Sequence, residues 1–391
     1  METQTPRFSR RVADLRPEGA YSMLARAQEL EAQGRSIIHM EVGQPDIETF
    51  THIRMRGIRA IEEGHTRYNP PAGLRDLRQV IAAEAGSRRG MEIRPEQVLV
   101  GPGAKPGLFF PTLALIEPGD EVIYPDPGFP TYPAMIAVAG GRPVPVPLRE
   151  ENSFSFDLEV FDRLVSPRTR LIILNSPANP TGGVMPLADL EHIAAAARER
   201  DCWVISDEIY ARLSYTGRSV PSIAALPGMA ERTVIVDGFS KTYAMTGWRL
   251  GYAIMPEALA DRVNLLLTHS IGCTATFTQI AGIEALTGSQ EEVDVMIHEY
   301  QRRRDRLVNG LNSLPGVRCQ LPEGAFYAFP NVKSLGEPVR QLADRLLEQA
   351  GVAVLPGTDF GRYGEGYLRL SYATSVEQIE IALERMGAVL R

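Results

Sequence analysis

The chain has 391 residues, a formal net charge of −7 at pH 7, 44% hydrophobic residues and 23% charged residues. This length and balance are typical of a globular protein and exclude collagen-like, low-complexity and wholly disordered chains. An acidic chain has no general attraction for nucleic acid, so we expect no nucleic-acid partner.

The predicted elements begin with a helix around 21–33 and a short strand at 36–41. From about residue 50 to 255, short apolar and β-branched runs alternate with helical stretches. Such runs indicate buried parallel strands with helices on both faces, so they predict an α/β sheet domain. The strands are expected at 97–100, 121–124, 171–174, 202–206, 233–236 and 250–254, and the clearest helices at 74–90 and 187–200.

The pattern changes beyond Pro256. A long helical region runs to about residue 314, and strand-like pieces follow at 316–329. A helix at 338–351 and a last strand at 366–371 complete the chain. This mixture predicts a separate α+β lobe.

Neither the cysteines nor the histidines indicate a metal site. Three widely spaced cysteines predict neither a disulfide framework nor a metal site, and the six histidines include no pair at helical ligand spacing.

The N-terminus lacks a signal peptide, and no apolar run approaches the roughly 20 residues that span a membrane. We therefore expect a cytoplasmic protein without a membrane partner. The densest basic run, Arg302 to Arg304, is expected to be a solvated helix face.

Lysine is rare in this chain, because only Lys105, Lys241 and Lys333 occur among its 41 basic residues. A primary amine forms imines with carbonyl cofactors, whereas a guanidinium group stays protonated. Lys241 follows the predicted strand at 233–236, at the sheet edge where open α/β folds bind ligands. Arg249, eight residues later, can clamp a phosphate. The pair alone fits a surface loop equally well.

Asp207 and Tyr210 follow the predicted strand at 202–206. A carboxylate there can keep a pyridine nitrogen protonated, and the phenol can donate a hydrogen bond to a ring oxygen. After the strand at 171–174, two closely spaced X-Pro bonds indicate a rigid turn that can fix the Asn179 amide against a ligand. Each segment alone is also compatible with an ordinary loop.

A glycine-rich segment, Val100-Gly-Pro-Gly-Ala-Lys-Pro-Gly107, links a strand to a helix. Backbone N–H groups at such a junction can bind phosphate. The glycine spacing also loosely matches nicotinamide-dinucleotide loops, so an oxidoreductase is one alternative function.

Six short motifs occur in order along the chain. They are Gly43-Gln-Pro-Asp46, Tyr68-Asn-Pro-Pro-Ala-Gly73-Leu-Arg75, Asn179-Pro-Thr-Gly182, Asp207-Glu-Ile-Tyr210, Ser240-Lys-Thr-Tyr-Ala-Met-Thr-Gly-Trp-Arg249 and Leu368-Arg-Leu-Ser371. Together they resemble the pyridoxal-phosphate-dependent aminotransferases of fold type I, class I and II, the aspartate aminotransferase superfamily. The resemblance covers nearly the whole chain, and the motif at 240–249 is its most specific part.

The resemblance implies a large domain with a mostly parallel seven-stranded sheet at residues 47–280. It implies a small α+β domain formed by residues 1–46 and 281–391, with the active site between the two domains. It also implies a homodimer with shared active sites.

The resemblance assigns roles around the ring of pyridoxal 5′-phosphate. Lys241 is expected to form the Schiff base and to shuttle protons. Asp207 is expected at the pyridine nitrogen, and Tyr210 and Asn179 at the phenolate oxygen. Phe129 matches the aromatic ring that stacks on the cofactor.

Further matches concern the phosphate and the substrate. Gly103, Ala104 and Lys105 correspond to the backbone phosphate cradle, and Arg249 corresponds to the phosphate clamp. Tyr68 corresponds to the residue that reaches the phosphate of the neighbouring subunit. Arg369 and Gly43, with Asn179, match the groups that bind the substrate α-carboxylate.

Two positions depart from the family pattern. Gly238 stands where many relatives have a serine that contacts phosphate, which leaves open whether Ser240 takes that contact. The cradle sequence Gly-Ala-Lys-Pro is less hydrophilic than in many relatives. Neither departure touches the expected catalytic residues Lys241, Asp207 and Tyr210.

The expected reaction is ping-pong transamination between an L-amino acid and a 2-oxo acid. A β-lyase, decarboxylase, racemase or biosynthetic cyclase would use the same residues, because fold and cofactor do not fix the bond that breaks. A catalytically silent ligand-binding module is a further alternative. The stretch 268–277 contains no arginine for a second substrate carboxylate, which favours neutral or aromatic donors over aspartate.

Overall fold

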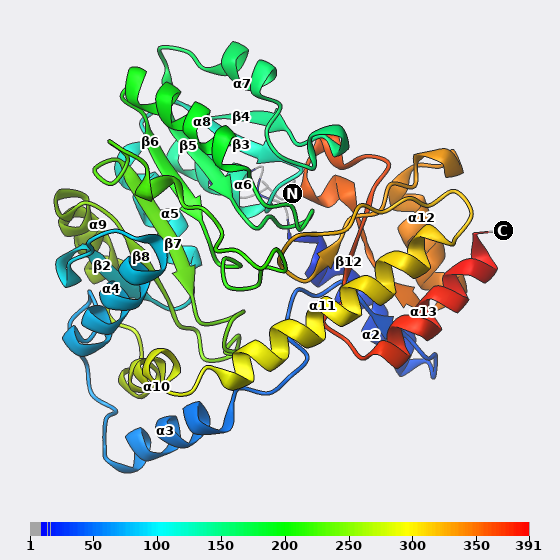
Figure 1. The fold of residues 1–391 in the computed structure, drawn as a ribbon, viewed down its shortest axis with the longest axis horizontal. Coiled ribbons are helices and arrows are strands. Elements are labelled where there is room, and N and C mark those ends of the chain that lie inside the picture. The colour runs from blue at the N-terminus through cyan, green and yellow to red at the C-terminus, as the bar shows by residue number, and fades with distance from the viewer. Residues whose placement is uncertain (1–8, 14, 16, 391) are drawn as a thin grey trace, which may run out of the picture.

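The computed structural model describes residues 9–13, 15 and 17–390. Its central feature is a seven-stranded sheet in the order β2-β8-β7-β6-β5-β3-β4 (Figure 1). The strands are β2 (Val98–Gly101), β3 (Glu121–Asp126), β4 (Arg142–Pro147), β5 (Thr169–Asn175), β6 (Trp203–Asp207), β7 (Thr233–Gly238) and β8 (Gly251–Ile254). This sheet confirms the α/β fold predicted from the sequence.

Strand β8 runs antiparallel to both of its neighbours, so the expectation of a parallel strand at 250–254 is wrong. A parallel neighbour of β7 would need a crossover connection of a dozen or more residues, usually with a helix. Residues 239–250 connect β7 to β8 without a helix, so the chain turns back beside β7.

The edge strand β4 was not expected from the sequence. Its residues are Arg142-Pro-Val-Pro-Val-Pro147, and proline cannot donate a hydrogen bond to a sheet ladder. The strand lies at the outer edge next to β3, where only one side needs partners. Proline is tolerated at such an edge and would be excluded from the middle of the sheet.

Helices cover both faces of this sheet. On one face, Leu171 and Ile173 of β5 belong to an apolar cluster with α5 (Lys105–Leu115), α6 (Thr131–Ala139) and α9 (Glu257–Ser270). On the other face, Ile172 and Leu174 belong to a cluster with α7 (Leu158–Leu164) and α8 (Leu187–Glu199). Helices α4 (Arg75–Arg89) and α10 (Thr276–Thr287) contact each other, and α3 (Thr51–Glu62) contacts α10. Alternate residues of each strand therefore face opposite layers, as expected for a buried sheet.

The remaining elements combine the two ends of the chain. Strand β1 (Ile38–His39) pairs in parallel with β10 (Val352–Ala353), and a second small sheet has the order β11 (Leu355–Pro356), β12 (Leu368–Ser371), β9 (Tyr327–Ala328). The helices here are α2 (Gly19–Ala32), α11 (Glu291–Asn312), α12 (Val339–Arg345) and α13 (Val376–Val389), while the short α1 (Arg10–Ala13) contacts α6. Figure 1 shows the blue α2 among the yellow-to-red elements.

The basic run on α11 is not the solvated face expected from the sequence, because only its first residue is exposed. Arg303 is 8% exposed and Arg304 is 6% exposed. Arg303 Nη1 donates to both carboxylate oxygens of Asp46 at 2.8 Å, which ties α11 to the loop after β1. Arg304 donates to the carbonyl oxygen of Pro322 and lies 4.7 Å from the centre of the Tyr215 ring.

We predict that Arg303→Leu lowers the free energy of unfolding by about 2 kcal/mol, because it leaves the Asp46 carboxylate without its charged donor. The neighbouring Arg302→Leu is the matched control. Its side chain is 63% exposed and, among the described residues, pairs only with Glu299 of the same helix, so stability should stay nearly unchanged. Denaturant unfolding of both variants measures the difference. Equal stability of the two variants would contradict the proposed importance of the Asp46 contact.

Candidate active site

A cavity of about 1540 Å³ lies at the carboxyl ends of β5 and β6, beside the loop after β7. Its other walls come from residues 42–49 after β1, the start of α5, and single residues of β9 and β12. Most of the residues singled out in the sequence line it: Gly43, Ala104, Lys105, Phe129, Asn179, Asp207, Tyr210, Ser240, Lys241, Arg249 and Arg369. Residues more than 300 positions apart in the chain therefore meet in one place.

Lys241 extends into this cavity from the loop after β7. Its Nζ donates a hydrogen bond to the carbonyl oxygen of Gly43 at 2.5 Å. Burial lowers the pKa of Lys241 to about 8, and the positive charges of Arg369 and Arg249 act in the same direction while Asp207 opposes them. Near neutral pH such a lysine is a neutral, nucleophilic amine far more often than an ordinary lysine is.

Asp207 is buried at the end of β6, on the same face of the sheet as α6. Its carboxylate accepts a hydrogen bond from the Tyr132 hydroxyl at 2.8 Å and from the Ile209 backbone N–H at 3.3 Å. Burial raises the pKa of Asp207 to about 6, whereas the hydrogen bond from Tyr132 lowers it. The carboxylate is thus held ready for a cationic ring nitrogen.

Tyr210 and Asn179 also line the cavity. The Tyr210 hydroxyl is 2.7 Å from the hydroxyl of Tyr327, and burial holds the pKa of Tyr210 well above its ordinary value. The backbone N–H of Asn179 donates to Asn175 Oδ1 at 2.8 Å. The Tyr210 phenol is therefore uncharged at neutral pH, and the Asn179 backbone is held in place while its side-chain oxygen accepts from Arg369.

Arg369, on β12, is 3% exposed. Its guanidinium group lies 4.5 Å from the centre of the Tyr327 ring and 4.9 Å from that of Phe360. It donates to Asn179 Oδ1 at 3.2 Å and to the backbone carbonyl of Glu41. Its Nε has no hydrogen-bond partner within the part of the chain that the structure describes. A buried guanidinium with free donor capacity is suited to bind a carboxylate.

The glycine-rich segment forms the opposite end of the cavity. Gly103 has φ +87°, and a Cβ atom there would lie 2.4 Å from Arg249 Nη2. Only glycine permits both that backbone conformation and that approach. Ala104 and Lys105 follow at the start of α5, whose free N–H groups favour an anion, and the guanidinium of Arg249 lies beside them. Ser240, 9% exposed, also lines this end.

Lys105 is engaged at the mouth of the cavity. Its Nζ forms an ion pair with Glu18 and lies 5.3 Å from the centre of the Phe129 ring. Phe129 in turn contacts Tyr132 edge to face at 5.7 Å between ring centres. The ring of Phe129 thus forms part of the wall above Asp207.

Of the candidates, Gly103 does not itself line this cavity but lies between the lining residues Pro102 and Ala104, and only Tyr68 lies apart from it. Its side chain is 99% exposed and does not line the cavity of its own chain. Tyr132, Tyr327 and Asn175 are site residues that the sequence analysis did not identify. A signal for Tyr132 existed, because it lies three residues after Phe129, at the spacing that brings side chains together on one side of a helical turn.

Comparison with known proteins agrees with this geometry. A family model described as "Aminotransferase class I and II" matches residues 35–386. The chain belongs to this family. It is 40% identical to an aspartate aminotransferase of Pyrococcus abyssi, with 93% of this chain and 94% of the relative covered. It is 39% identical to aromatic-amino-acid aminotransferase 2 of Thermococcus litoralis, with 92% and 93% covered.

Solved structures give the same result. Aspartate aminotransferase from Thermus thermophilus with maleate matches with a TM-score of 0.94 and 39% identity, over 98% of this chain and all of that one. This aminotransferase is therefore a pyridoxal-phosphate enzyme of fold type I, and the function predicted from the sequence is confirmed. The nicotinamide alternative is not supported by any of these relatives.

The residues present fit pyridoxal phosphate. Lys241 would supply an amine of lowered pKa for its aldehyde, and Asp207 would supply a buried carboxylate for its ring nitrogen. The start of α5 together with Arg249 supplies donors for its phosphate. Among the described residues, no cluster of metal-ligating side chains and no helix long and apolar enough to cross a membrane is found.

The lowered pKa of Lys241 predicts how the aminotransferase binds its cofactor. If Lys241 forms the imine, as the resemblance implies, its neutral amine would be the reacting form, so covalent binding of pyridoxal phosphate by the apoprotein should accelerate as pH rises through about 8. Stopped-flow absorbance measures this rate. In Asp207→Asn, the midpoint should move to lower pH, because the anion that raises the pKa of Lys241 is gone. A midpoint near ~10, as for an ordinary lysine, would contradict the prediction.

Proposed function

We propose that the aminotransferase moves an amino group between an L-amino acid and a 2-oxo acid, with Lys241 as the covalent and proton-transfer residue. The observation that carries this proposal is the burial of its amine in the cavity, where it donates to the Gly43 carbonyl and where burial and the charge of Arg369 lower its pKa. Pyridoxal phosphate, when bound, supplies the electron sink for the reaction. The chain's own residues then have to bind, orient and move protons.

In this proposal Lys241 Nζ takes the proton from the substrate α-carbon and moves it to the cofactor carbon. Asp207 keeps a proton on the ring nitrogen, and Tyr210 and Asn179 bind the ring's phenolate oxygen. Phe129 orients the ring by stacking. Burial of Asp207 and its hydrogen bond from Tyr132 support its role, because both fix the carboxylate in one orientation.

The phosphate would be held by the backbone N–H groups of Gly103, Ala104 and Lys105, by Ser240 and by Arg249. The substrate α-carboxylate would be held by Arg369, Gly43 and Asn179. The free donor capacity of Arg369 at its Nε, within the described residues, supports this second assignment.

We also propose the division into a large domain of residues 47–280 and a small domain of residues 1–46 and 281–391. The pairing of β1 with β10 supports it, because it attaches the N-terminal segment to the C-terminal elements. The three cysteines of the chain form no disulfide in the structure, and we place the enzyme in the cytoplasm.

A homodimer with shared sites is part of the same proposal. On α3, the side chains of Met55, Ile58 and Ile61 are 45–51% exposed, and Ile58 and Ile61 also line the cavity. An apolar helix face that opens into the active-site cavity is suited to a second copy of the chain. Tyr68 would then reach the phosphate end of the partner's cavity.

We propose that neutral or aromatic amino acids are better donors than aspartate. The cavity is lined by Arg54 and Lys105 besides the cations already assigned, and each has a carboxylate partner, Glu48 and Glu18. A substrate side-chain carboxylate would have to compete with these partners. The named relatives include both aspartate and aromatic-amino-acid aminotransferases, so the family alone does not choose between the donors.

The half-reactions of aspartate, alanine and phenylalanine, followed by the absorbance of the bound cofactor, test activity and donor range together. We expect alanine or phenylalanine to react at least as fast as aspartate. The Lys241→Ala variant should be folded, as judged by circular dichroism, and should react with none of them. Full turnover by Lys241→Ala would end the proposed role of the lysine. Aspartate reacting about a hundredfold faster than both others would overturn the donor preference.

Subunit mixing tests the shared site. Lys241→Ala and Tyr68→Ala should each be nearly inactive alone. In a mixed dimer, the intact Lys241 of one subunit meets the intact Tyr68 of the other, so equal mixing should restore roughly a quarter of the wild-type activity. If Tyr68 served its own chain, no mixed dimer would contain a complete site. Mixed dimers without activity would therefore exclude the shared-site arrangement.

A further inference from the structure

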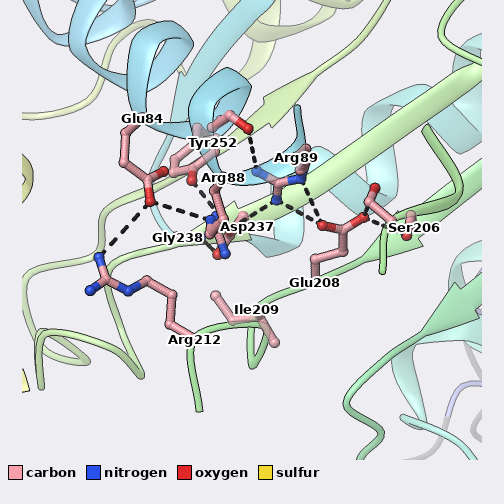
Figure 2. A network of polar contacts seen from close by, with 12 residues as sticks. Glu84, Arg88, Arg89, Ser206, Glu208, Ile209, Arg212, Asp237, Gly238 and Tyr252 are labelled. Atoms are coloured by element: carbon pink, nitrogen blue, oxygen red, sulfur yellow. Dashed lines mark hydrogen bonds and ion pairs between the residues drawn. The ribbon is translucent and has the colours of Figure 1, made fainter. Parts of the chain in front are cut away.

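A network of buried charges lies behind the active site, on the face of the sheet opposite to Asp207. Figure 2 shows Arg88 and Arg89, from the last turn of α4, pointing at the carboxylates of Glu208 and Asp237. The side chains of Arg89, Glu208 and Asp237 are only 2%, 5% and 6% exposed. Charges this well shielded from water interact strongly with their neighbours.

Strand alternation explains why the network adjoins the active site. Asp207 has the same orientation as Ile205 and faces α6, whereas Ser206 and Glu208 point to the other side. Glu208 is therefore the immediate neighbour of the catalytic carboxylate in the chain, and its own carboxylate is on the side of α4.

Glu208 is held by both of its oxygens. Oε2 accepts from Arg89 Nε at 2.8 Å and lies 2.7 Å from Arg89 Nη2. Oε1 accepts from the hydroxyls of Ser206 at 2.9 Å and Ser222 at 2.6 Å. Among the described residues, Arg89 is thus the only cation that forms an ion pair with Glu208.

Asp237 is held in a similar way at the end of β7. Oδ2 accepts from Arg88 at 2.5 Å, from Arg89 at 3.3 Å and from the Tyr252 hydroxyl at 3.2 Å. Oδ1 accepts from the backbone N–H of Gly238 at 2.7 Å, in the segment that leads to Lys241. One arginine, Arg89, therefore contacts both carboxylates beside the active site.

The charges of these two carboxylates act on Asp207. Burial raises the pKa of Asp207 most, and Asp237 and Glu208 raise it further. Glu208 and Asp237 in turn raise the pKa of Arg89 above its ordinary value, although burial opposes its charge. Arg89 offsets the negative charge that would otherwise favour protonation of Asp207.

The ionisable groups around Asp207 come from every neighbouring element. They are Tyr132 of α6, Glu208 and Tyr210 after β6, Asp237 of β7 and Lys241, and behind these Glu84, Arg88 and Arg89 of α4, Tyr252 of β8 and Arg212. Glu84 is shared by Arg88 at 3.3 Å and Arg212 at 3.9 Å, so it does not compete with Glu208 and Asp237 for Arg89.

We propose that Arg89 is a positioning residue for the reaction, which keeps Asp207 ionised and fixed by neutralising Glu208 and Asp237 behind it. This inference rests on the proposed role of Asp207 at the ring nitrogen. Arg89 touches neither the cofactor nor the substrate, and it acts only through the two carboxylates.

The test measures the affinity of the apoprotein for pyridoxal phosphate as a function of pH. Affinity should fall as pH decreases through the pKa of Asp207, near 6, because the protonated carboxyl no longer attracts the ring nitrogen. In Arg89→Met the loss of a nearby cation should move this fall upward by about one pH unit. The titration of the cofactor's own phosphate is common to all variants and cancels in the comparison.

Matched variants separate charge from structure. Arg89→Lys keeps the charge and should keep the wild-type midpoint. Arg89→Met combined with Glu208→Gln restores the charge balance and should return the midpoint toward that of the wild type. Glu208→Gln alone leaves an excess of positive charge and should move the midpoint downward, which keeps the test decisive if Arg89→Met does not fold. Arg94→Met, at an exposed pair with Glu257, is the control without effect.

Each outcome decides the proposal. A uniform loss of affinity in Arg89→Met without a shift of the midpoint, or an unshifted Glu208→Gln, would show a purely structural role and overturn it. The Asp207→Asn variant shows whether the proposed role of Asp207 itself has failed. If its affinity still falls near pH 6 as in the wild type, the proposed role of Asp207 itself is wrong. If Asp207→Asn abolishes the fall while Arg89→Met leaves it in place, only the role of Arg89 is wrong.

Discussion

The active site depends on keeping charged groups ionised in places from which water is largely excluded. Asp207 and Arg369 are 5% and 3% exposed, and burial shifts the pKa of each toward its neutral form. Each therefore needs fixed dipoles or opposite charges nearby. Tyr132 and the Ile209 N–H supply them for Asp207, and two aromatic faces with Asn179 and a backbone carbonyl supply them for Arg369.

The alternation of side chains along each strand places neighbouring charged groups on opposite faces of the sheet. At the end of β6, consecutive residues point to opposite sides, so one carboxylate faces the cavity while its neighbour faces an arginine on α4. The same arrangement recurs at the end of β7, where Asp237 is anchored behind the sheet a few residues before Lys241 enters the cavity. Catalytic and supporting charges are thus kept apart by the strand itself.

Much of this could be predicted from the sequence. Strand-end positions of Lys241, Asp207 and Asn179 follow from apolar runs ending at polar residues, and the motif resemblance joined them to Arg369 across the chain. The direction of β8 was missed because apolar runs look alike in parallel and antiparallel strands. The edge strand β4 was missed because its three prolines argue against any strand.

Contacts between distant segments could not be predicted from the sequence pattern. Arg303 and Arg304 look like any charged run on a helix, and only the fold shows that Asp46 and Tyr215 lie opposite them. The network of Arg89 has the same origin, since no local spacing connects it to residues 208 and 237. Periodicity reveals which face is apolar, but buried ion pairs depend on which elements meet.

The parallel pairing of β1 with β10 has a consequence for synthesis of the protein. The strand partners of residues 38–39, at 352–353, are synthesised more than 300 residues later. All seven strands of the large sheet, and with them Lys241 and Asp207, precede residue 255. The sheet can therefore form before residues 352–371 are synthesised, whereas Arg369 can contact the backbone of Glu41 only afterwards. The part of the cavity that holds Lys241 thus depends on earlier residues of the chain than the part that holds Arg369.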